Sequence, residues 1–190
     1  MARWEPDARE RLVRAALELF AEQGYDNSTV AQIAERAGLT KSTFFRHFPD
    51  KREVLAAGQD TLCRLFEAGI ASAPASATPL QAVAAGLDSA AEAFTPERRD
   101  LGPKMQAAIA ASTELQERDT LKRVGLATAI TDALKERGVP DPVASLAAEL
   151  GVLALRMAHA RWSDPANQQE LAALGRESLQ ELQTASATLS

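Results

Sequence analysis

The sequence predicts an all-α protein of about nine helices, and three observations support this prediction. No stretch shows the alternation of apolar and polar residues that indicates a half-buried strand. Alanine, leucine, glutamate and glutamine dominate, and all favour helices. Residues that start and end helices recur along the chain. With 190 residues, 46% of them hydrophobic, the chain is long enough to bury a core in one or two domains.

The first expected helix lies before Gly24 and has one apolar face. Its apolar residues recur at positions i, i+3, i+4, i+7 and i+8, the spacing of a helix face packed on a core. Residues 23–25 are expected to end this helix. The members of the apolar stripe are Leu12, Ala15, Ala16, Leu19 and Phe20.

Residues 29–48 predict two short helices joined by a tight turn. Thr29 and Gln32 have the spacing of a capping box, in which each side chain accepts a hydrogen bond from a free N–H at the helix start. Gly38 is suited to the left-handed conformation that ends a helix. Thr40 is then expected to cap a second helix over residues 41–47. Two helices joined in this way form the helix-turn-helix that places its second helix in the DNA major groove.

Residues 8–66 resemble the DNA-binding domain of TetR-family transcriptional repressors. The family pattern is a helix, a Gly-Tyr or Gly-Phe corner, a T-V-x-x-I-A-x-x-A-G helix, a short recognition helix ending Y-x-H-F, and a lysine that opens the fourth helix. The resemblance implies a DNA-binding domain over residues 1–55 and a helical effector-binding and dimerisation domain over residues 56–190. The matching positions are Gly24-Tyr25, residues 29–38, residues 45–48 and Lys51.

The resemblance also implies a function. We expect a sequence-specific transcriptional regulator, most often a repressor, that a small-molecule effector releases from an approximately palindromic double-stranded DNA operator. The residues leave one alternative open, a helical DNA-binding regulator without a small-molecule effector and controlled by a protein partner. A solvent-accessible pocket in the C-terminal domain would favour the effector.

Nine residues of the motif and its flanks are expected to contact DNA. The start of the second helix offers short hydroxyls and a lysine beside the positive end of the helix dipole, a setting that favours phosphate. Lys41 is expected to donate to guanine, and the methyl group of Thr43 to touch thymine. The resemblance makes His47 and Lys51 phosphate clamps. The full set is Thr29, Thr40, Lys41, Ser42, Thr43, Phe45, Arg46, His47 and Lys51.

Two positions depart from the family pattern. Phe45 stands where most members have a tyrosine whose hydroxyl bonds a phosphate, so that hydrogen bond is lost, although the ring can still contact sugar or a thymine methyl. Ser42 stands where many members have glycine. The base contacts of relatives therefore cannot be transferred directly to this chain.

Charge is distributed unevenly. The chain has 21 basic and 26 acidic residues, a net charge of −5. A protein of this balance is a poor general coat for nucleic acid but can bind a specific site. The expected binding region is locally basic, because within residues 36–52 Asp50 is the single acidic residue beside Arg36, Lys41, Arg46, Lys51 and Arg52.

Six further helices are expected after the motif. Asp50 is expected to cap a helix that runs to about residue 73, with Glu53 completing a capping box. Thr-Pro and Asp-Pro pairs indicate the later starts, because proline is favoured in the first turn. Gly102-Pro103 is expected to kink or split its helix. The later helices are expected over about 78–94, from 95 onwards, and over 113–137, 142–162 and 165–185.

The last two helices, about 142–162 and 165–185, are expected to form a homodimer. In the resembled family they make a four-helix bundle between two subunits, and a dimer can read two half-sites. Small residues on the first helix allow close approach, and leucines form a stripe on the second. The alternative is that both sets pack an intramolecular core. They are Ala147, Ala148, Gly151, Ala154, Ala158, Leu171, Leu174, Leu179 and Leu182.

Six residues are candidates for the effector pocket, although each also fits an ordinary core or surface position. Aromatic residues are scarce beyond residue 60, which favours a compact or aliphatic effector. The candidates are Phe66, Phe94, Met105, Gln106, Thr128 and His159.

Residue types needed for catalysis are scarce. The chain has two histidines, one cysteine and no glycine-rich phosphate loop. Glu149 and His159 are too far apart in sequence to form an i, i+4 pair. We expect no enzyme, no catalytic residue, no cofactor and no metal site.

The sequence favours a cytoplasmic protein. Its start lacks the apolar segment of a secretory signal, and no apolar run approaches the ~18–20 residues that span a bilayer. Cys63 alone cannot form an intramolecular disulfide, which suits a reducing compartment, and it is expected to be a buried thiol.

Overall fold

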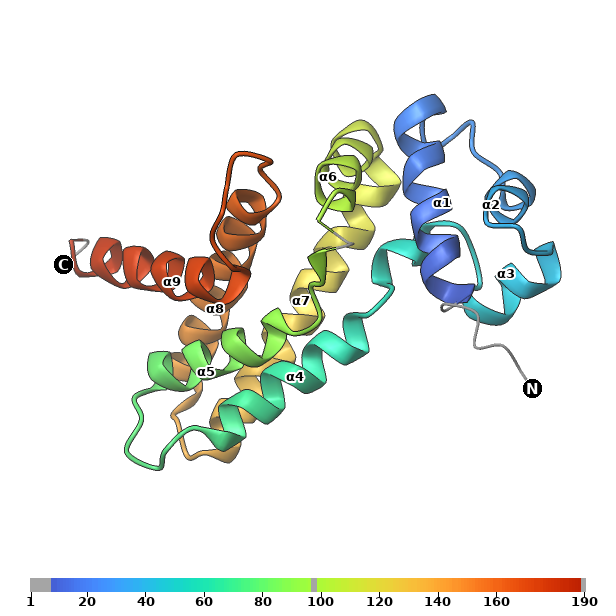
Figure 1. Cartoon of the computed structure of the whole chain (residues 1–190). Helices are drawn as coiled ribbons and strands as arrows, with labels where there is room; N and C mark the ends of the chain where they lie inside the picture. The colour runs from blue at the N-terminus through green and yellow to red at the C-terminus, as the bar shows by residue number, and fades with distance from the viewer. Residues whose placement is uncertain (1–7, 97–98, 189–190) are drawn as a thin grey trace, which may run out of the picture. The chain divides into compact units, whose positions relative to one another are not determined.

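The computed structural model describes residues 8–96 and 99–188, and the regular structure within them is helical (Figure 1). The predicted all-α class with nine helices is confirmed for these residues, which also include one short 3-10 helix, η1. The elements are α1 (Ala8–Gln23), α2 (Val30–Arg36), α3 (Lys41–His47), η1 (Arg52–Ala56), α4 (Gln59–Ser72), α5 (Pro79–Ala91), α6 (Leu101–Ala111), α7 (Thr113–Glu136), α8 (Asp141–Trp162) and α9 (Leu171–Ala187).

The chain divides into two compact units. The first comprises residues 1–57 and 100–122, and the second comprises residues 58–99 and 123–190. The division after Ala57 lies close to the boundary expected at residue 55. The expected division did not include residues 100–122 in the first unit, where α6 packs on α1. Helix α7 begins in the first unit and ends in the second.

The first unit has a single core built from α1, α2, α3, η1 and α6. The apolar stripe expected on the first helix faces this core and is buried. Phe44 and Phe48 are almost fully buried, with ring centroids 5.6 Å apart. These two rings anchor α3 on the core, where Phe44 packs in the same cluster as Ile33 and Leu19.

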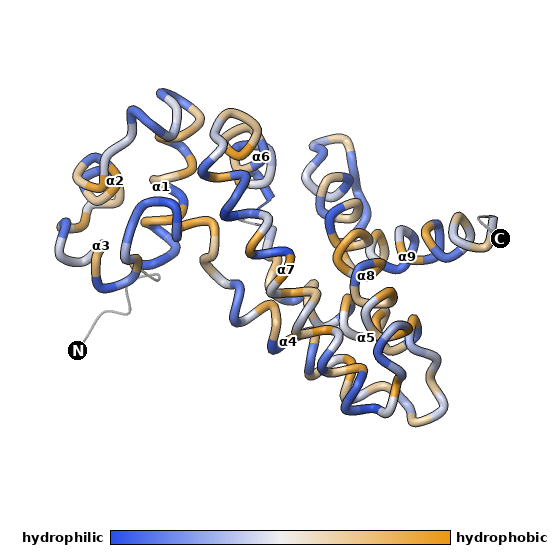
Figure 2. The backbone as a smooth tube through the Cα atoms, turned by 180° about the vertical axis from the view of Figure 1, so that it is seen from behind, coloured by the Kyte–Doolittle hydropathy of each residue, from blue (hydrophilic) through white to orange (hydrophobic). Residues whose placement is uncertain are grey.

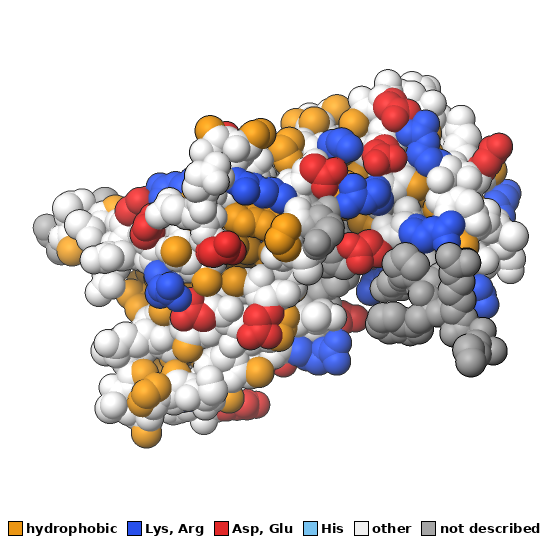
Figure 3. Space-filling model, in the orientation of Figure 1, with side chains coloured by type: hydrophobic (Ala, Val, Ile, Leu, Met, Phe, Trp, Pro, Cys, Tyr) orange, Lys and Arg blue, Asp and Glu red, His pale blue; other side chains and the backbone are white. Residues whose placement is uncertain are grey.

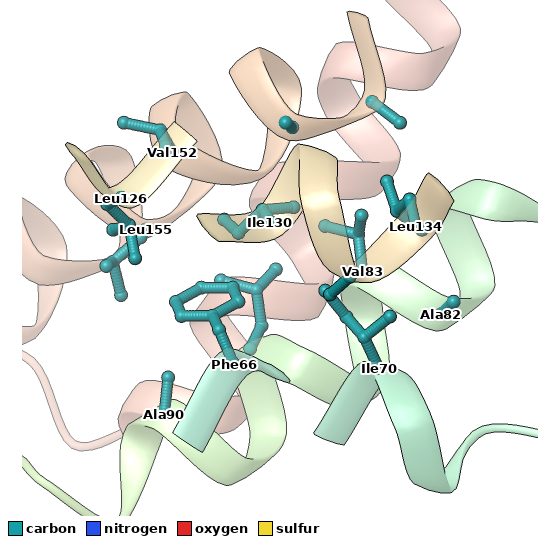
Figure 4. Close-up of a cluster of buried hydrophobic side chains, with 14 of the residues drawn as sticks. Phe66, Ile70, Ala82, Val83, Ala90, Leu126, Ile130, Leu134, Val152 and Leu155 are labelled. Atoms are coloured by element: carbon teal, nitrogen blue, oxygen red, sulfur yellow. The ribbon is translucent and has the colours of Figure 1, made fainter. Parts of the chain in front are cut away.

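The second unit has its own core, formed by α4, α5, α8 and the later turns of α7. Phe66, Ile70, Val83, Ile130 and Leu134 lie at its centre (Figure 4). Helix α4 carries both hydrophobic and hydrophilic residues, as expected of a helix with one buried face (Figure 2). Burial of apolar surface is therefore the main stabilising contribution in each unit.

Small residues allow helices of the second unit to approach closely. A Cβ added at Gly69 of α4 would lie 2.5 Å from the carbonyl oxygen of Ala85 on α5. One added at Gly151 of α8 would lie 2.7 Å from a methyl group of Val83. The small residues that the sequence assigned to dimerisation are thus buried within the subunit, and so are Leu171, Leu174 and Leu179. The intramolecular interpretation is correct for these residues.

Several expected helix boundaries need correction. The helix expected from Asp50 to residue 73 is interrupted at Gly58, whose φ of 82° lies in the left-handed region. Asp50 caps η1, because its Oδ1 accepts from the backbone N–H of Arg52 (2.9 Å) and of Glu53 (3.2 Å). Glu53 does not complete a capping box and instead pairs with Arg118.

Two proline positions also differ from expectation. Gly102-Pro103 lies in the first turn of α6, where the missing N–H of proline has no partner to lose, so the helix is neither kinked nor split there. Helix α9 begins at Leu171 and not at Pro165. Residues 164–169 form turns, in which Asp164 Oδ1 accepts from the N–H of Ala166 at 2.8 Å. By contrast, the start of α5 is as expected, with a capping box between Thr78 and Gln81.

Candidate nucleic-acid interface

The start of α2 has the predicted capping box. Thr29 Oγ1 accepts from the N–H of Gln32 at 3.2 Å, and Gln32 Oε1 accepts from the N–H of Thr29 at 2.9 Å. At the other end of α2, Gly38 takes a φ of 66°, the left-handed conformation that an L side chain rarely adopts. The side chain of Arg11 donates to the carbonyl oxygen of Ala37 beside this turn. Both ends of α2 are therefore fixed by hydrogen bonds.

Helix α3 is held so that one face points outward. Thr40 Oγ1 accepts from the N–H of Thr43 at 3.1 Å and caps the helix, as predicted. Because Phe44 is buried, the residues on the opposite side of the helix are exposed to solvent. They include Ser42 and Arg46, and Lys41 is exposed in the first turn of the helix. Arg46 Nη2 lies 3.4 Å from the hydroxyl of Thr43 and remains exposed.

Phe45 is the one aromatic residue among the large exposed hydrophobic residues of the described chain. Its exposed fraction is 52%, and its ring meets that of Phe44 edge to face with centroids 5.7 Å apart. An apolar ring held on an outward-facing recognition helix is suited to contact a sugar or a thymine methyl.

The expected basic strip is partly neutralised by carboxylates. Arg36 lies 2.6 Å from Glu22, and Arg52 lies 3.0 Å from Asp50. On the face shown in Figure 3, acidic and basic side chains are intermixed. The positive charge available on α3 itself is therefore that of Lys41 and Arg46.

Lys51 lies against the loop that precedes α2. Its Nζ donates to the carbonyl oxygens of Tyr25 (2.7 Å) and Ser28 (3.0 Å) and stands 4.0 Å from the centre of the Tyr25 ring. A lysine ammonium has three donors, so one remains for a phosphate oxygen. His47, the other expected clamp, is half-buried, with its ring centroid 6.5 Å from that of Phe48.

Two pairs of residues, whose contacts the sequence does not predict, connect this region to α7. The Tyr25 hydroxyl donates to Glu114 Oε1 at 2.8 Å. Burial, and then this hydrogen bond, raise the pKa of Tyr25 above its usual value. Arg118 donates through Nε and Nη2 to the two carboxylate oxygens of Glu53, at 2.8 and 2.9 Å. The partners are 89 and 65 positions apart in sequence, so no local pattern indicates them.

The six effector candidates are divided between the two units. Met105 and Gln106 belong to α6 of the first unit. In the second unit, Phe66 is core and Thr128 is exposed, with its hydroxyl donating to the Val124 carbonyl at 3.0 Å. A surface hollow of about 300 Å³ lies in the first unit between α1 and the end of α2, and its lining includes none of the six.

Phe94 and His159 do lie together, in an aromatic group completed by Trp162. The ring centroids of Phe94 and His159 are 5.4 Å apart, and that of Trp162 lies 6.3 Å from Phe94 and 5.9 Å from His159. Arg99 stacks over Trp162 and donates to its carbonyl oxygen at 2.6 Å. Sequence reasoning did not include Trp162 or Arg99 among the candidates, because no helical spacing links residues 94, 99 and 162.

Three further observations concern metal binding, a membrane span and Cys63. Within residues 8–96 and 99–188, no three histidine, cysteine, aspartate or glutamate side chains are grouped to hold a metal ion. By length and composition alone α8 could cross a membrane, but 44% of that stretch is buried in the second unit, as in a core helix. Cys63, expected to be buried, is half-buried and packs against the core of that unit.

The amino-terminal region matches known proteins in sequence. The family model described as "Bacterial regulatory proteins, tetR family" matches residues 12–57. The transcriptional regulator TcmR of Streptomyces glaucescens is 45% identical over 75 residues, which are 40% of this chain and 33% of that protein. SrpR of Pseudomonas putida, another transcriptional regulator, is 45% identical over 51 residues, 27% of this chain and 24% of that protein. These matches span a third or less of the relatives' lengths.

Solved structures match along almost the whole chain. A transcriptional regulator from Aquifex aeolicus VF5 has a TM-score of 0.55 at 20% identity, covering 94% of this chain and 99% of that one. A transcriptional regulator from Rhodococcus sp. Rha1 has a TM-score of 0.52 at 22% identity, covering 94% and 97%. At such identities the likeness establishes the fold alone.

A capped helix, a left-handed glycine and a second helix anchored by buried phenylalanines together make this an all-α helix-turn-helix protein. Its residues 12–57 match the model of the tetR family of bacterial regulatory proteins, and this region is where the named relatives are similar to it. The family and the relatives named above are transcriptional regulators and not enzymes, in agreement with the sequence analysis.

Proposed function

We propose that this protein binds a specific DNA operator through α3 and represses transcription there until a small-molecule effector releases it. The observation that supports this proposal best is the outward face of α3. Lys41 and Arg46 supply charge on that face, Phe45 supplies an apolar contact, and the buried Phe44 fixes the helix behind them. A rigid helix that presents donors, a cation and an apolar group fits the edges of bases in the major groove.

The nine candidate residues have separate roles in this proposal. Lys41 donates to guanine and Thr43 contacts a thymine methyl, so these two residues read sequence. Phosphate contacts set the register of the protein on the duplex and carry no sequence information. The phosphate contacts come from Thr29, Thr40, Ser42, Arg46, His47 and the remaining N–H of Lys51.

A homodimer through α8 and α9 completes the proposed regulator. The supporting observation is an apolar stripe on α8 that remains exposed in one subunit, made by Val143, Leu146 and Leu153. Positions i, i+3 and i+10 lie on one face of a helix. A second copy would cover this stripe and supply the second recognition helix for an approximately palindromic operator, with half-sites about 34–36 Å apart.

The effector site is proposed for the second unit, around Phe94, His159 and Trp162. Apart from these rings, the unit holds two buried serine hydroxyls, Ser163 and Ser178, without a hydrogen-bond partner among the described residues. Buried polar groups are normally satisfied, so these hydroxyls are candidates to bind a polar atom of a ligand. A regulator of this kind works on chromosomal DNA, and we therefore propose a cytoplasmic location.

Fluorescence anisotropy with purified protein tests the proposed function. Labelled DNA from the region upstream of the protein's own gene is titrated over a salt series, against random-sequence competitor. We expect specific binding by two subunits per site that weakens as salt rises. Absence of preference for this or any genome-selected DNA would contradict the proposal.

A further inference from the structure

The start of α7 is packed into the first unit and carries two charged side chains one turn apart. Glu114 accepts a hydrogen bond from the Tyr25 hydroxyl, and Arg118 donates two hydrogen bonds to the Glu53 carboxylate. Glu53 belongs to η1, which begins directly after Lys51. Helix α7 therefore forms hydrogen bonds to Tyr25, which contacts Lys51, and to η1, which follows Lys51 in the chain.

Tyr25 links Glu114 directly to Lys51. Its side chain is 5% exposed, and one end of it, the hydroxyl, is fixed by Glu114. Its ring lies under the Lys51 ammonium and its carbonyl oxygen accepts a hydrogen bond from that ammonium. The second oxygen that Lys51 contacts belongs to Ser28, the neighbour of Thr29 at the start of α2. Hydrogen bonds thus run from α7 through Tyr25 to Lys51 and on to Ser28, which precedes Thr29 in the chain.

We propose that Tyr25 and Glu114 are positioning residues for DNA binding, which keep the Lys51 ammonium and the start of α2 in place before DNA arrives. This inference rests on the proposed function. The physical reason is preorganisation: lysine has a flexible stem, and ordering it during binding costs affinity. The Lys51 ammonium is already fixed by the Tyr25 ring and by the carbonyl oxygens of Tyr25 and Ser28, and Glu114 in turn fixes Tyr25. Much of the ordering cost is therefore removed before DNA binds.

Substitution of Glu114 separates this role from simple electrostatics. Glu114→Ala removes a negative charge from a DNA-binding protein, and charge alone predicts tighter binding to DNA. Positioning predicts the opposite, a loss of about fivefold in operator affinity, within the usual range of coupling between sites. The matched control is Glu117→Ala, an exposed glutamate in the same helix. We expect the control to bind as well as the unsubstituted protein or slightly better.

A double variant tests whether the effect passes through Lys51. Tyr25→Phe keeps the ring and removes the hydroxyl, and we expect it to weaken operator binding about as much as Glu114→Ala does. Combined with Lys51→Ala it should cause no loss beyond that of Lys51→Ala alone, because the two residues act as one unit. Circular dichroism of each variant establishes that it is folded at the temperature of the titration.

Three outcomes contradict the inference: unchanged operator affinity in folded Glu114→Ala, tighter binding by it, or additive losses in the double variant. Each can occur while the unsubstituted protein binds its operator, so the inference can fail without the proposed function. If the unsubstituted protein binds no specific DNA, both fail together.

Discussion

Lys41 and Lys51 carry the same charge in different surroundings. Lys41 is exposed at the start of α3, whereas Lys51 is bound to two carbonyl oxygens. Lys41→Ala is expected to reduce both operator affinity and discrimination between operator and random DNA, by about 1–3 kcal/mol for a lost base contact. Lys51→Ala should weaken binding to all sequences equally and lower the salt slope by about one. An unchanged salt slope in Lys51→Ala would show that Lys51 does not contact phosphate.

Phe45 allows an uncharged contact to be separated from the charged ones. Phe45→Ala is expected to weaken operator binding and to leave its salt dependence unchanged. An uncharged phenyl ring releases no counterion from DNA when it binds. Its exposed fraction of 52% makes the folded state tolerant of this change. Anisotropy titrations at several salt concentrations measure both quantities. A change in slope without a change in affinity at low salt would contradict the assignment.

Individual residues were predictable where their partners are close in sequence. The capping box of Thr29 with Gln32 and the cap of Thr40 on Thr43 each span three positions, and a local pattern is sufficient to identify them. The hydrogen bond between Tyr25 and Glu114 joins parts of the chain that only folding brings together. Periodicity in a single sequence contains no information about such pairs.

At the scale of the element, two glycines within helices differ in how much space surrounds them. A Cβ at Gly69 would approach the Ala85 carbonyl oxygen to 2.5 Å, so Gly69→Ala should destabilise the fold by about 1–3 kcal/mol. A Cβ at Gly175 would meet Leu87 at 3.7 Å, an ordinary contact. Gly175→Ala should therefore be neutral or stabilise by up to about 1 kcal/mol, since alanine favours the helix. Urea unfolding of both variants measures the difference, and equal effects would contradict it.

Helix boundaries were predictable where a side chain caps the helix and less so elsewhere. Thr78-Pro79 begins α5 as expected, because the threonine hydroxyl satisfies a free N–H. Asp164-Pro165 gives the same signal but begins a turn, since Asp164 caps the N–H of Ala166 and the chain turns again before Leu171. Gly58 has no sequence neighbour that would indicate a break, yet its left-handed φ separates η1 from α4.

At the scale of the whole molecule, the exposed stripe of α8 determines the expected assembly. Leu146 is 62% exposed, and Leu146→Glu is expected to convert dimers to monomers and so to weaken operator binding. Leu121→Glu is the matched control, because Leu121 is 63% exposed on α7 outside the proposed interface. Sedimentation of both variants gives their masses. A dimeric Leu146→Glu would place the interface elsewhere.

The first unit is discontinuous along the chain, and this has a consequence for how the protein is made. Residues 1–57 leave the ribosome first, but their partners in α6 and early α7 follow only when residue 122 has been synthesised. At about 5–20 residues per second the delay is several seconds. A chain that terminates between residues 57 and 114 contains the whole helix-turn-helix but lacks Glu114 and Arg118, so we expect it to compete poorly for the operator. DNA binding is therefore expected to require synthesis of the chain through early α7.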